Sequence, residues 1–214
     1  PLKKGKRVAV EGPDAVADDL SCAAMTAATG LNSVRIADVA LTRINAAHDQ
    51  IRAAAWRVLK VNFATSLEVA QAAPEALCDT VPEVRRNALT VLIETKQIDK
   101  FIAIAIEDDD ALVRADAVAQ LSGNRVLDFI ADPDAGVRRA ALSVALTSGD
   151  ADVTKQAISQ AFASARVDTI ALGFQQSAEM RREAQIRLAD KGISGRDHFV
   201  ILDALTVSWP REHP

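Results

Sequence analysis

The chain has 214 residues, of which 49% are hydrophobic, 25% are charged and 4% are aromatic, with 9 Gly and 7 Pro. That length is enough to bury a core as one or two domains, and the few aromatic and turn-forming residues exclude a β-sandwich or a propeller and favour an all-α fold. The formal net charge of −4 argues against a general electrostatic attraction to nucleic acid or to anionic lipid.

The first 48 residues predict an atypical N-terminal cap. Alanine-rich helical patterns cover residues 14–29 and 34–47, with Gly30 as a stop signal between them and Ser33 as a helix cap. Terminal units of a helical stack differ from inner ones because they bury surface on one side only. We therefore expect residues 1–48 to close one end of a helical array.

A short motif recurs between residues 49 and 190. It consists of an aliphatic residue, then arginine, and then alanine four positions after the aliphatic residue. The aliphatic residue, the alanine and a leucine that is usual at the ninth position fall on one stripe of an α-helix, which predicts a helix that packs against a neighbour. The clearest copies are 84–92, 113–121 and 137–145, and looser copies are 51–59 and 180–188.

The remaining segments predict shorter or altered units. Residues 125–131 indicate an abbreviated first helix, and the patterns 153–165 and 167–176 indicate a unit that has lost the motif. Residues 191–214 are expected to form a C-terminal cap and tail, with a short closing helix over 197–207 and Trp209 folded back over the last repeat.

An aspartate precedes the arginine of the motif by six positions in the three clear copies. An aspartate at this place can cap the helix N-terminus. Six helical positions leave the aspartate and arginine side chains on different faces, so we expect each arginine to bond the aspartate of an adjacent unit and tie successive units together. These ladder residues are Asp79, Arg85, Asp108, Arg114, Asp132 and Arg138.

The segments around Arg85, Arg114 and Arg138, each with the pattern Val-Arg-x-x-Ala and an aspartate upstream, resemble the signature of HEAT repeats. The motifs lie closer together than the about 40–47 residues of ordinary units, as in the compact repeats of phycobilin-lyase-type and leucine-rich-variant proteins. The resemblance implies a single domain over residues 1–214. That domain would be a right-handed α–α superhelix of about five to six short repeats, with the second helix of each pair on a concave face.

No pattern in the sequence is typical of catalysis, a metal site or a cofactor. The three histidines lie far apart, without a partner at metal-binding spacing. Ser194, Asp197 and His198 fit a loop and a helix cap better than a nucleophilic group. The acidic run 107–110 lacks the spacing and glycine of a calcium loop and indicates a solvated turn. Two cysteines cannot supply the four thiolates of an iron–sulfur cluster. We expect no catalytic residue, no metal and no cofactor.

Three features indicate where the protein resides. The longest apolar run, 101–106, is far shorter than the about 20 residues of a membrane-spanning helix, so we expect no membrane partner. Basic residues near the start are followed by acidic ones where a signal peptide would be apolar. Cys22 and Cys78 fit a reducing compartment as separate thiols. We therefore expect a cytoplasmic protein.

Two classes of function remain open. The second arginine of the motif and its neighbours lie on either a solvated helix face or a partner-binding groove, and we favour a non-enzymatic interaction or adaptor module that binds another protein or a peptide segment. The partner-binding candidates are Arg57, Lys60, Arg86, Asn87, Asp116, Gln120, Arg139 and Arg182.

The alternative is a HEAT-like enzyme, by resemblance either an alkylated-base DNA glycosylase or a bilin lyase acting on a tetrapyrrole. Trp56 beside Arg57 and Lys60 invites the first comparison, because those glycosylases use concave aromatic residues beside basic ones. The acidic composition and the presence of only two tryptophans disfavour nucleic acid as the partner.

Overall fold

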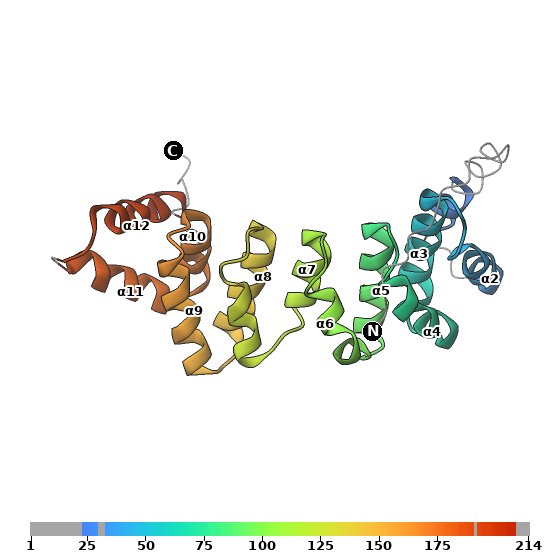
Figure 1. Ribbon diagram of the computed structural model, residues 1–214, viewed down its shortest axis with the longest axis horizontal. Coiled ribbons are helices and arrows are strands. Elements are labelled where there is room, and N and C mark those ends of the chain that lie inside the picture. The colour runs from blue at the N-terminus through green and yellow to red at the C-terminus, as the bar shows by residue number, and fades with distance from the viewer. Residues whose placement is uncertain (1–22, 30–32, 191, 209–214) are drawn as a thin grey trace. The chain divides into compact units, whose positions relative to one another are not determined.

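The structure, a computed structural model, describes residues 23–29, 33–190 and 192–208 (Figure 1). The chain divides into two compact units, Pro1–Val113 and Arg114–Pro214, here called unit 1 and unit 2. All regular secondary structure in the described ranges is helical, which confirms the all-α prediction. A single continuous domain over the whole chain stays a prediction.

Unit 1 holds its helices in two layers. The helix α3 packs against α5, and α4 packs on α5 from the other layer. Residues 23–28 are also helical, and the boundary between the units falls within α7. The helices of unit 1 are α2 (Val34–Arg43), α3 (Asp49–Phe63), α4 (Leu67–Ala76), α5 (Pro82–Glu94), η1 (Ile98–Lys100), α6 (Ile102–Ala105) and the start of α7 (Ala111–Val118).

Unit 2 repeats this layering. The helix α10 packs between α8 and α12. We call α8, α10 and α12 the second helices of unit 2, and α3 and α5 the second helices of unit 1. In the other layer α9 contacts η2 and α8, and α11 contacts α10 and α12. Beside the end of α7, unit 2 contains η2 (Gly123–Phe129), α8 (Ala135–Thr147), α9 (Ala151–Ala163), α10 (Val167–Gln176), α11 (Ala178–Ala189) and α12 (Gly195–Ser208).

The apolar stripe of the motif forms the core of each unit, as the helical period predicts. In α5, Val84, Ala88 and Leu92 are fully buried, and the equivalent residues of α3 and α8 are buried as well. Trp56 is 1% exposed, so it belongs to the core of unit 1 and is not an accessible aromatic residue beside Arg57 and Lys60. Alanine at the centre of each stripe allows the helices to approach closely.

The helix boundaries follow the predictions closely in unit 2 and less closely at the start of the chain. The expected helices 153–165, 167–176 and 197–207 correspond to α9, α10 and α12. The expected short helix over 125–131 is the 3₁₀-helix η2. The expected helix 34–47 ends at Arg43.

Of the remaining expectations near the chain ends, the cap at Ser33 is wrong and the others are not tested. Ser33 does precede the first residue of α2, but its side chain makes no capping hydrogen bond. Residues 14–22 of the expected first helix, the stop at Gly30 and the contact of Trp209 lie outside the described residues.

The looser copy 180–188 is not equivalent to the other copies. It forms α11, which lies on the side of α9, whereas α5 and α8 are second helices. Its first arginine, Arg181, is exposed and donates to the carbonyl oxygen of Phe174 instead of joining a carboxylate of a following segment. The unit that lacks the motif, over residues 153–176, ends with α10. In α10 the residue after the aliphatic Ile170 is Ala171, where the motif has arginine.

Candidate functional site

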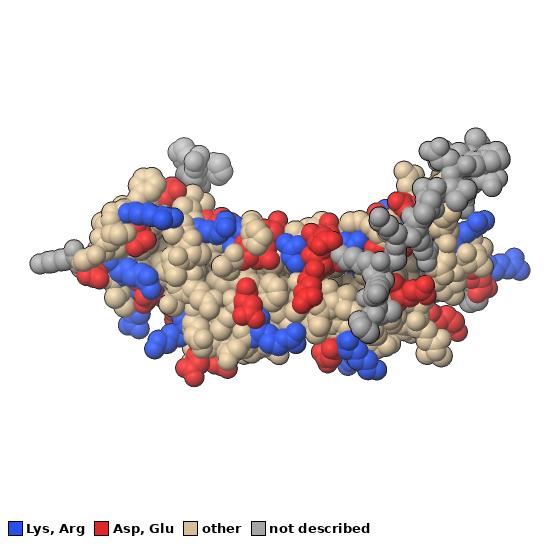
Figure 2. Space-filling view, in the orientation of Figure 1, with Lys and Arg blue, Asp and Glu red and all other residues tan. Residues whose placement is uncertain are grey.

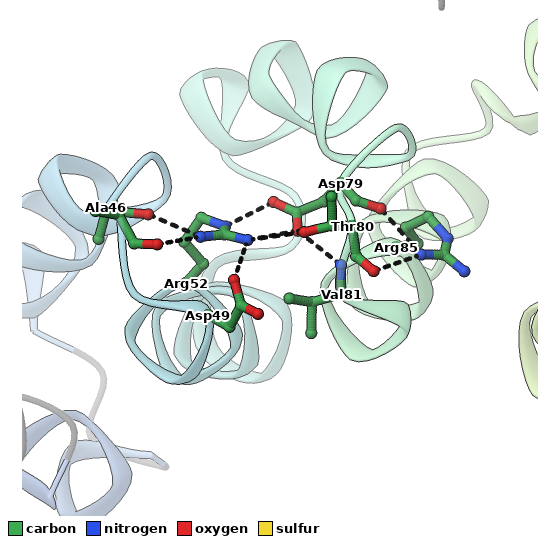
Figure 3. A network of polar contacts seen from close by, with 8 residues as sticks. Ala46, Asp49, Arg52, Asp79, Thr80, Val81 and Arg85 are labelled. Carbon is green, nitrogen blue, oxygen red and sulfur yellow. Dashed lines mark hydrogen bonds and ion pairs between the residues drawn. The ribbon is translucent and has the colours of Figure 1, made fainter. Parts of the chain in front are cut away.

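The first polar network of unit 1 is centred on Arg52, which is 1% exposed (Figure 3). Its Nε and Nη2 atoms donate to the two carboxylate oxygens of Asp79 at 2.8 and 2.9 Å. Its Nη1 atom donates to the carbonyl oxygens of Ala46 and Ala47 at 2.9 and 3.0 Å, and Nη2 also reaches Asp49 at 2.7 Å. The guanidinium group therefore joins the loop before α3 to the loop before α5.

Arg85 of α5 makes the same set of contacts one segment later. Its Nε and Nη2 atoms donate to Asp108 at 2.7 and 2.6 Å, and its Nη1 atom donates to the carbonyl oxygens of Asp79 and Thr80 at 2.9 and 3.2 Å. Asp79 thus serves two arginines, Arg52 through its carboxylate and Arg85 through its carbonyl group (Figure 3). The contacts form one continuous network in unit 1.

Unit 2 contains the same arrangement with a different acceptor. Arg138 donates through Nη1 to the carbonyl oxygens of Asp132 and Pro133 at 2.8 and 2.9 Å. Its Nε atom donates to Thr169 Oγ1 at 3.0 Å, and its Nη2 atom bonds the Asp168 carboxylate. These acceptors come from the first turn of α10, so the guanidinium group ties α8 to α10.

The ladder spacing predicts that each arginine pairs with an aspartate of an adjacent segment. The structure contains this pair at Arg85–Asp108 and, with a longer contact of 3.4 Å, at Arg114–Asp132. The pairs Arg52–Asp79 and Arg138–Asp168 were not predicted. The first could have been found, because residues 51–59 carry the motif. The second had no signal, because the aspartate lies inside a helix and not in the loop before it.

The prediction that Asp79, Asp108 and Asp132 cap the helices is wrong. Each of these carboxylates accepts the backbone N–H two residues later, at 2.9, 2.8 and 2.8 Å, which closes a turn ahead of the helix. Two of the helices are capped by an aspartate two residues later: Asp110 accepts N–H groups at the start of α7, and Asp134 does so for α8, whereas α5 has no side-chain cap. The earlier aspartate is thereby directed to the arginine of the preceding segment.

These contacts favour the charged forms of the groups. The hydrogen bond with Asp79 raises the pKa of Arg52 although burial lowers it, and Asp108 has the same effect on the pKa of Arg85. Burial raises the pKa of Asp168, but the hydrogen bond and charge of Arg138 together with the hydrogen bonds of Thr169 lower it overall. These contacts therefore stabilise the charged forms of Arg52, Arg85 and Asp168.

The partner-binding candidates do not share one surface. Arg86 of α5 and Arg139 of α8 are exposed on second helices, whereas Arg182 is exposed on α11. Asn87 is 5% exposed and its Nδ2 atom has no hydrogen-bond partner, so the expectation that it projects from the surface is wrong. The candidates therefore lie on the exposed side of second helices, in the core, and on α11 in the other layer.

The other four candidates are divided in the same way. Arg57 bonds Glu83 through Nε at 3.0 Å on the exposed edge between α3 and α5. Lys60 and Asp116 are half-buried, and Gln120 is exposed. Figure 2 shows Lys and Arg side chains interspersed with Asp and Glu on the face in view. Mixed charge of this kind suits recognition of a protein better than attraction to a polyanion.

A groove of about 830 Å³ lies between α9 and α11 in unit 2. Lys155 and Ile158 line it from α9, and Arg182 and Ile186 line it from α11. Leu146, near the end of α8, contributes a further apolar side chain. The groove therefore combines aliphatic surface with cationic side chains, and it contains one of the partner-binding candidates.

Other candidate chemistry has a structural explanation. The Ser194 hydroxyl donates to the Asp197 carboxylate at 2.8 Å and accepts the Asp197 N–H at 3.1 Å, which is a helix cap at the start of α12. Among the described residues there is no group of three or more His, Cys, Asp or Glu that could hold a metal ion. Cys78 is a free, half-buried thiol, and Cys22 lies outside the described residues.

No protein-family model matches the sequence, and no curated protein matches it either. Over the described parts of the chain, every helix is too short or too polar to span a bilayer. The functional argument consequently depends on the contacts and surfaces described above.

Proposed function

We propose that this chain is a non-enzymatic interaction module, an adaptor that binds another protein through its second helices. The observation that carries the proposal is the contrast between two consecutive arginines. Arg138 is 4% exposed and bonds the loop before α8 and the first turn of α10, whereas Arg139 is exposed. In the part of the chain that the structure describes, no hydrogen bond or ion pair involves the Arg139 side chain.

In unit 1, Arg85 is likewise buried in its network, and Arg86 is exposed at the same position of the motif as Arg139. An exposed charged side chain that recurs at the same position of the motif is suited to contact with a partner. The fixed register of the helices would hold such side chains in place before binding, which reduces the entropy lost on association.

The proposal includes a HEAT-like arrangement, in which the repeats wind into a right-handed superhelix and the second helices line its concave face. Its support is the recurrence in both units of a buried arginine that joins its own preceding loop to the acidic residue of the following segment. An extended concave face of this kind typically binds a segment of another protein.

The test is partner capture from the native lysate with matched charge reversals. Wild type, the double variant Arg86→Glu/Arg139→Glu and the control Arg125→Glu are each immobilised, and the retained proteins are identified by mass spectrometry. Arg125 is exposed on η2, in the layer opposite the second helices. We expect a specific protein to be retained by wild type and control and lost from the double variant.

Identical protein profiles for wild type and the double variant would show that these arginines do not bind a partner. Steeply salt-dependent binding to DNA by the wild type would favour the alternative of an enzyme acting on nucleic acid. Both outcomes contradict the proposed interaction surface.

A further inference from the structure

The groove between α9 and α11 is lined by one continuous stripe of each helix. On α11 the lining residues recur at spacings of three and four, which places them on one face. They are Glu179, Arg182, Glu183, Ile186 and Arg187. On α9, Lys155, Ile158 and Ser159 share a face in the same way. Ile186 is 59% exposed, so an aliphatic wall of the groove has no covering residue within the described chain.

The charges of the groove are only partly neutralised. Arg187 pairs with Glu183 at 2.8 Å, and its guanidinium carbon lies 4.6 Å from the centre of the Phe162 ring. Among the described residues, Lys155 and Arg182 have no ion pair, although both are exposed at the groove. Glu179 lies in the first turn of α11, where the helix dipole favours a negative charge. Two cations therefore remain available to a ligand.

We propose that this groove binds a short segment of a partner protein that combines aliphatic and acidic residues. The aliphatic side chains contact Ile158 and Ile186, and a carboxylate lies between Lys155 of α9 and Arg182 of α11. Charge complementarity selects this partner, because a basic segment would meet two unpaired cations while an acidic one neutralises them. An aliphatic contact also removes the exposed wall of the groove from water.

The inference rests on the proposed function, since it assigns a class of partner to one surface of the same module. It uses a different surface, because Lys155 and Arg182 lie on α9 and α11 whereas Arg86 and Arg139 lie on second helices. The two surfaces can therefore be tested separately by charge reversal.

The experiment selects binders from a library of short random peptides with the wild-type chain as bait. Affinities of the selected peptides are then measured by fluorescence anisotropy for wild type, for Lys155→Glu/Arg182→Glu and for the control Arg125→Glu. We expect the selected peptides to carry Asp or Glu beside Leu, Ile or Val. We expect the double variant to bind them about tenfold or more weakly and the control to bind them as wild type does.

A second selection on the double variant supplies an independent readout. It should enrich basic in place of acidic residues beside the aliphatic ones, since the groove charge is reversed. The reversed residues are exposed, and circular dichroism with urea unfolding verifies that the variant is folded. Removal of the aliphatic wall by Ile186→Ser should weaken binding of the peptides selected on wild type.

Three results would overturn the groove assignment: no enrichment of acidic–aliphatic peptides, equal affinity for wild type and the double variant, or the same residue preference in both selections. If Lys155→Glu/Arg182→Glu binds the selected peptides as wild type does while Arg86→Glu/Arg139→Glu loses the lysate partner, the groove assignment fails and the proposed second-helix surface stands. If Lys155→Glu/Arg182→Glu loses peptide binding while Arg86→Glu/Arg139→Glu retains the same lysate proteins as wild type, the second-helix surface fails and the groove stands.

Discussion

Consecutive arginines in the motif differ because the helix turns by about 100° per residue. In α8, Val137 and Ala141 face the core, and Arg138 lies at the edge of that stripe, where its guanidinium group reaches the loop carbonyls and the next helix. Arg139 points to the opposite side and is exposed. A rotation by a single residue thus separates a structural side chain from one available to a partner.

Arg138→Lys should destabilise the protein by about 2–4 kcal/mol, because one ammonium group cannot replace a planar guanidinium that serves four acceptors, and buried acceptors lose their donors. Arg139→Lys should change the free energy of unfolding by no more than about 0.5 kcal/mol. Urea unfolding of the two variants measures the difference. Equal destabilisation by the two substitutions would contradict the structural role of Arg138.

The Asp168 carboxylate is a residue whose contribution depends on pH. Burial raises its pKa, but Arg138 and Thr169 together lower it below the ordinary value of 3.8. A carboxyl group whose pKa is lower in the folded state contributes stability above its unfolded-state pKa, and this contribution is lost as pH falls through the folded-state pKa. Because the side chain is 51% exposed, added salt should weaken the effect.

Asp168→Asn should therefore lower the free energy of unfolding at pH 6, and its difference from wild type should shrink as the pH falls below about 4. Urea unfolding across a pH series measures this difference. Asp128→Asn, at an exposed position of η2, is the matched control and should show a small difference at every pH. A difference for Asp168→Asn that is independent of pH would show that its charge does not stabilise the fold.

At the scale of whole helices, the packing of α10 against α11 depends on a glycine within α10. Gly173 is buried, and a Cβ atom at this position would lie 2.5 Å from Met180 Cε and 3.1 Å from Met180 Cγ. Glycine disfavours a helix interior by about 1 kcal/mol relative to alanine. The close approach of Met180 explains why α10 nevertheless carries glycine here.

Gly173→Ala should destabilise the wild type by about 1 kcal/mol, because overpacking outweighs the gain in helix propensity. In a Met180→Ala background the same substitution should stabilise the protein by about 1 kcal/mol, because the obstructing side chain is gone. A double-mutant cycle based on urea unfolding measures the reversal. Stabilisation of similar size in the two backgrounds would exclude the steric explanation.

The helices could be predicted because their apolar period is regular, and α10 begins and ends at the expected residues. The layer of a helix could not be predicted from its own stripe. Met180 and Ala184 are buried as the motif requires, yet α11 lies in the layer opposite the second helices. An apolar stripe shows that one face of a helix is covered, but it does not show which helix covers that face.

The candidate site was predictable to the same limited extent. Arg86 is exposed because it lies opposite the apolar stripe of its helix. Asn87 lies beside that stripe, and positions beside the stripe are buried where the helix has neighbouring helices. The acceptor Asp168 depends on the packing of α8 against α10, a contact between segments 30 residues apart. Groove residues such as Lys155 carry no motif and are brought together only by the fold.

At the scale of the whole molecule, each unit derives its order from contacts between neighbouring segments. In unit 1 the network runs from the loop before α3 through Asp79 and Thr80 to the aspartate before α7. In a chain of repeats, stability is approximately a sum of local terms and nearest-neighbour terms. The shared loop at Asp79 and Thr80 is such a nearest-neighbour term, because two arginines hold it from opposite sides.

Arg52→Lys and Arg85→Lys should therefore be coupled. Once Arg52 no longer holds the Asp79 carboxylate, the loop is freer to move and the carbonyl bonds to Arg85 weaken, so loss of Arg85 costs less in that background. We expect a coupling free energy of about 0.5–2 kcal/mol in a urea double-mutant cycle. Arg52→Lys combined with Glu94→Gln, an exposed residue at the end of α5, should be additive. If the two arginine substitutions were also additive, each arginine would stabilise only its own loop, and the continuous network would not couple one repeat to the next.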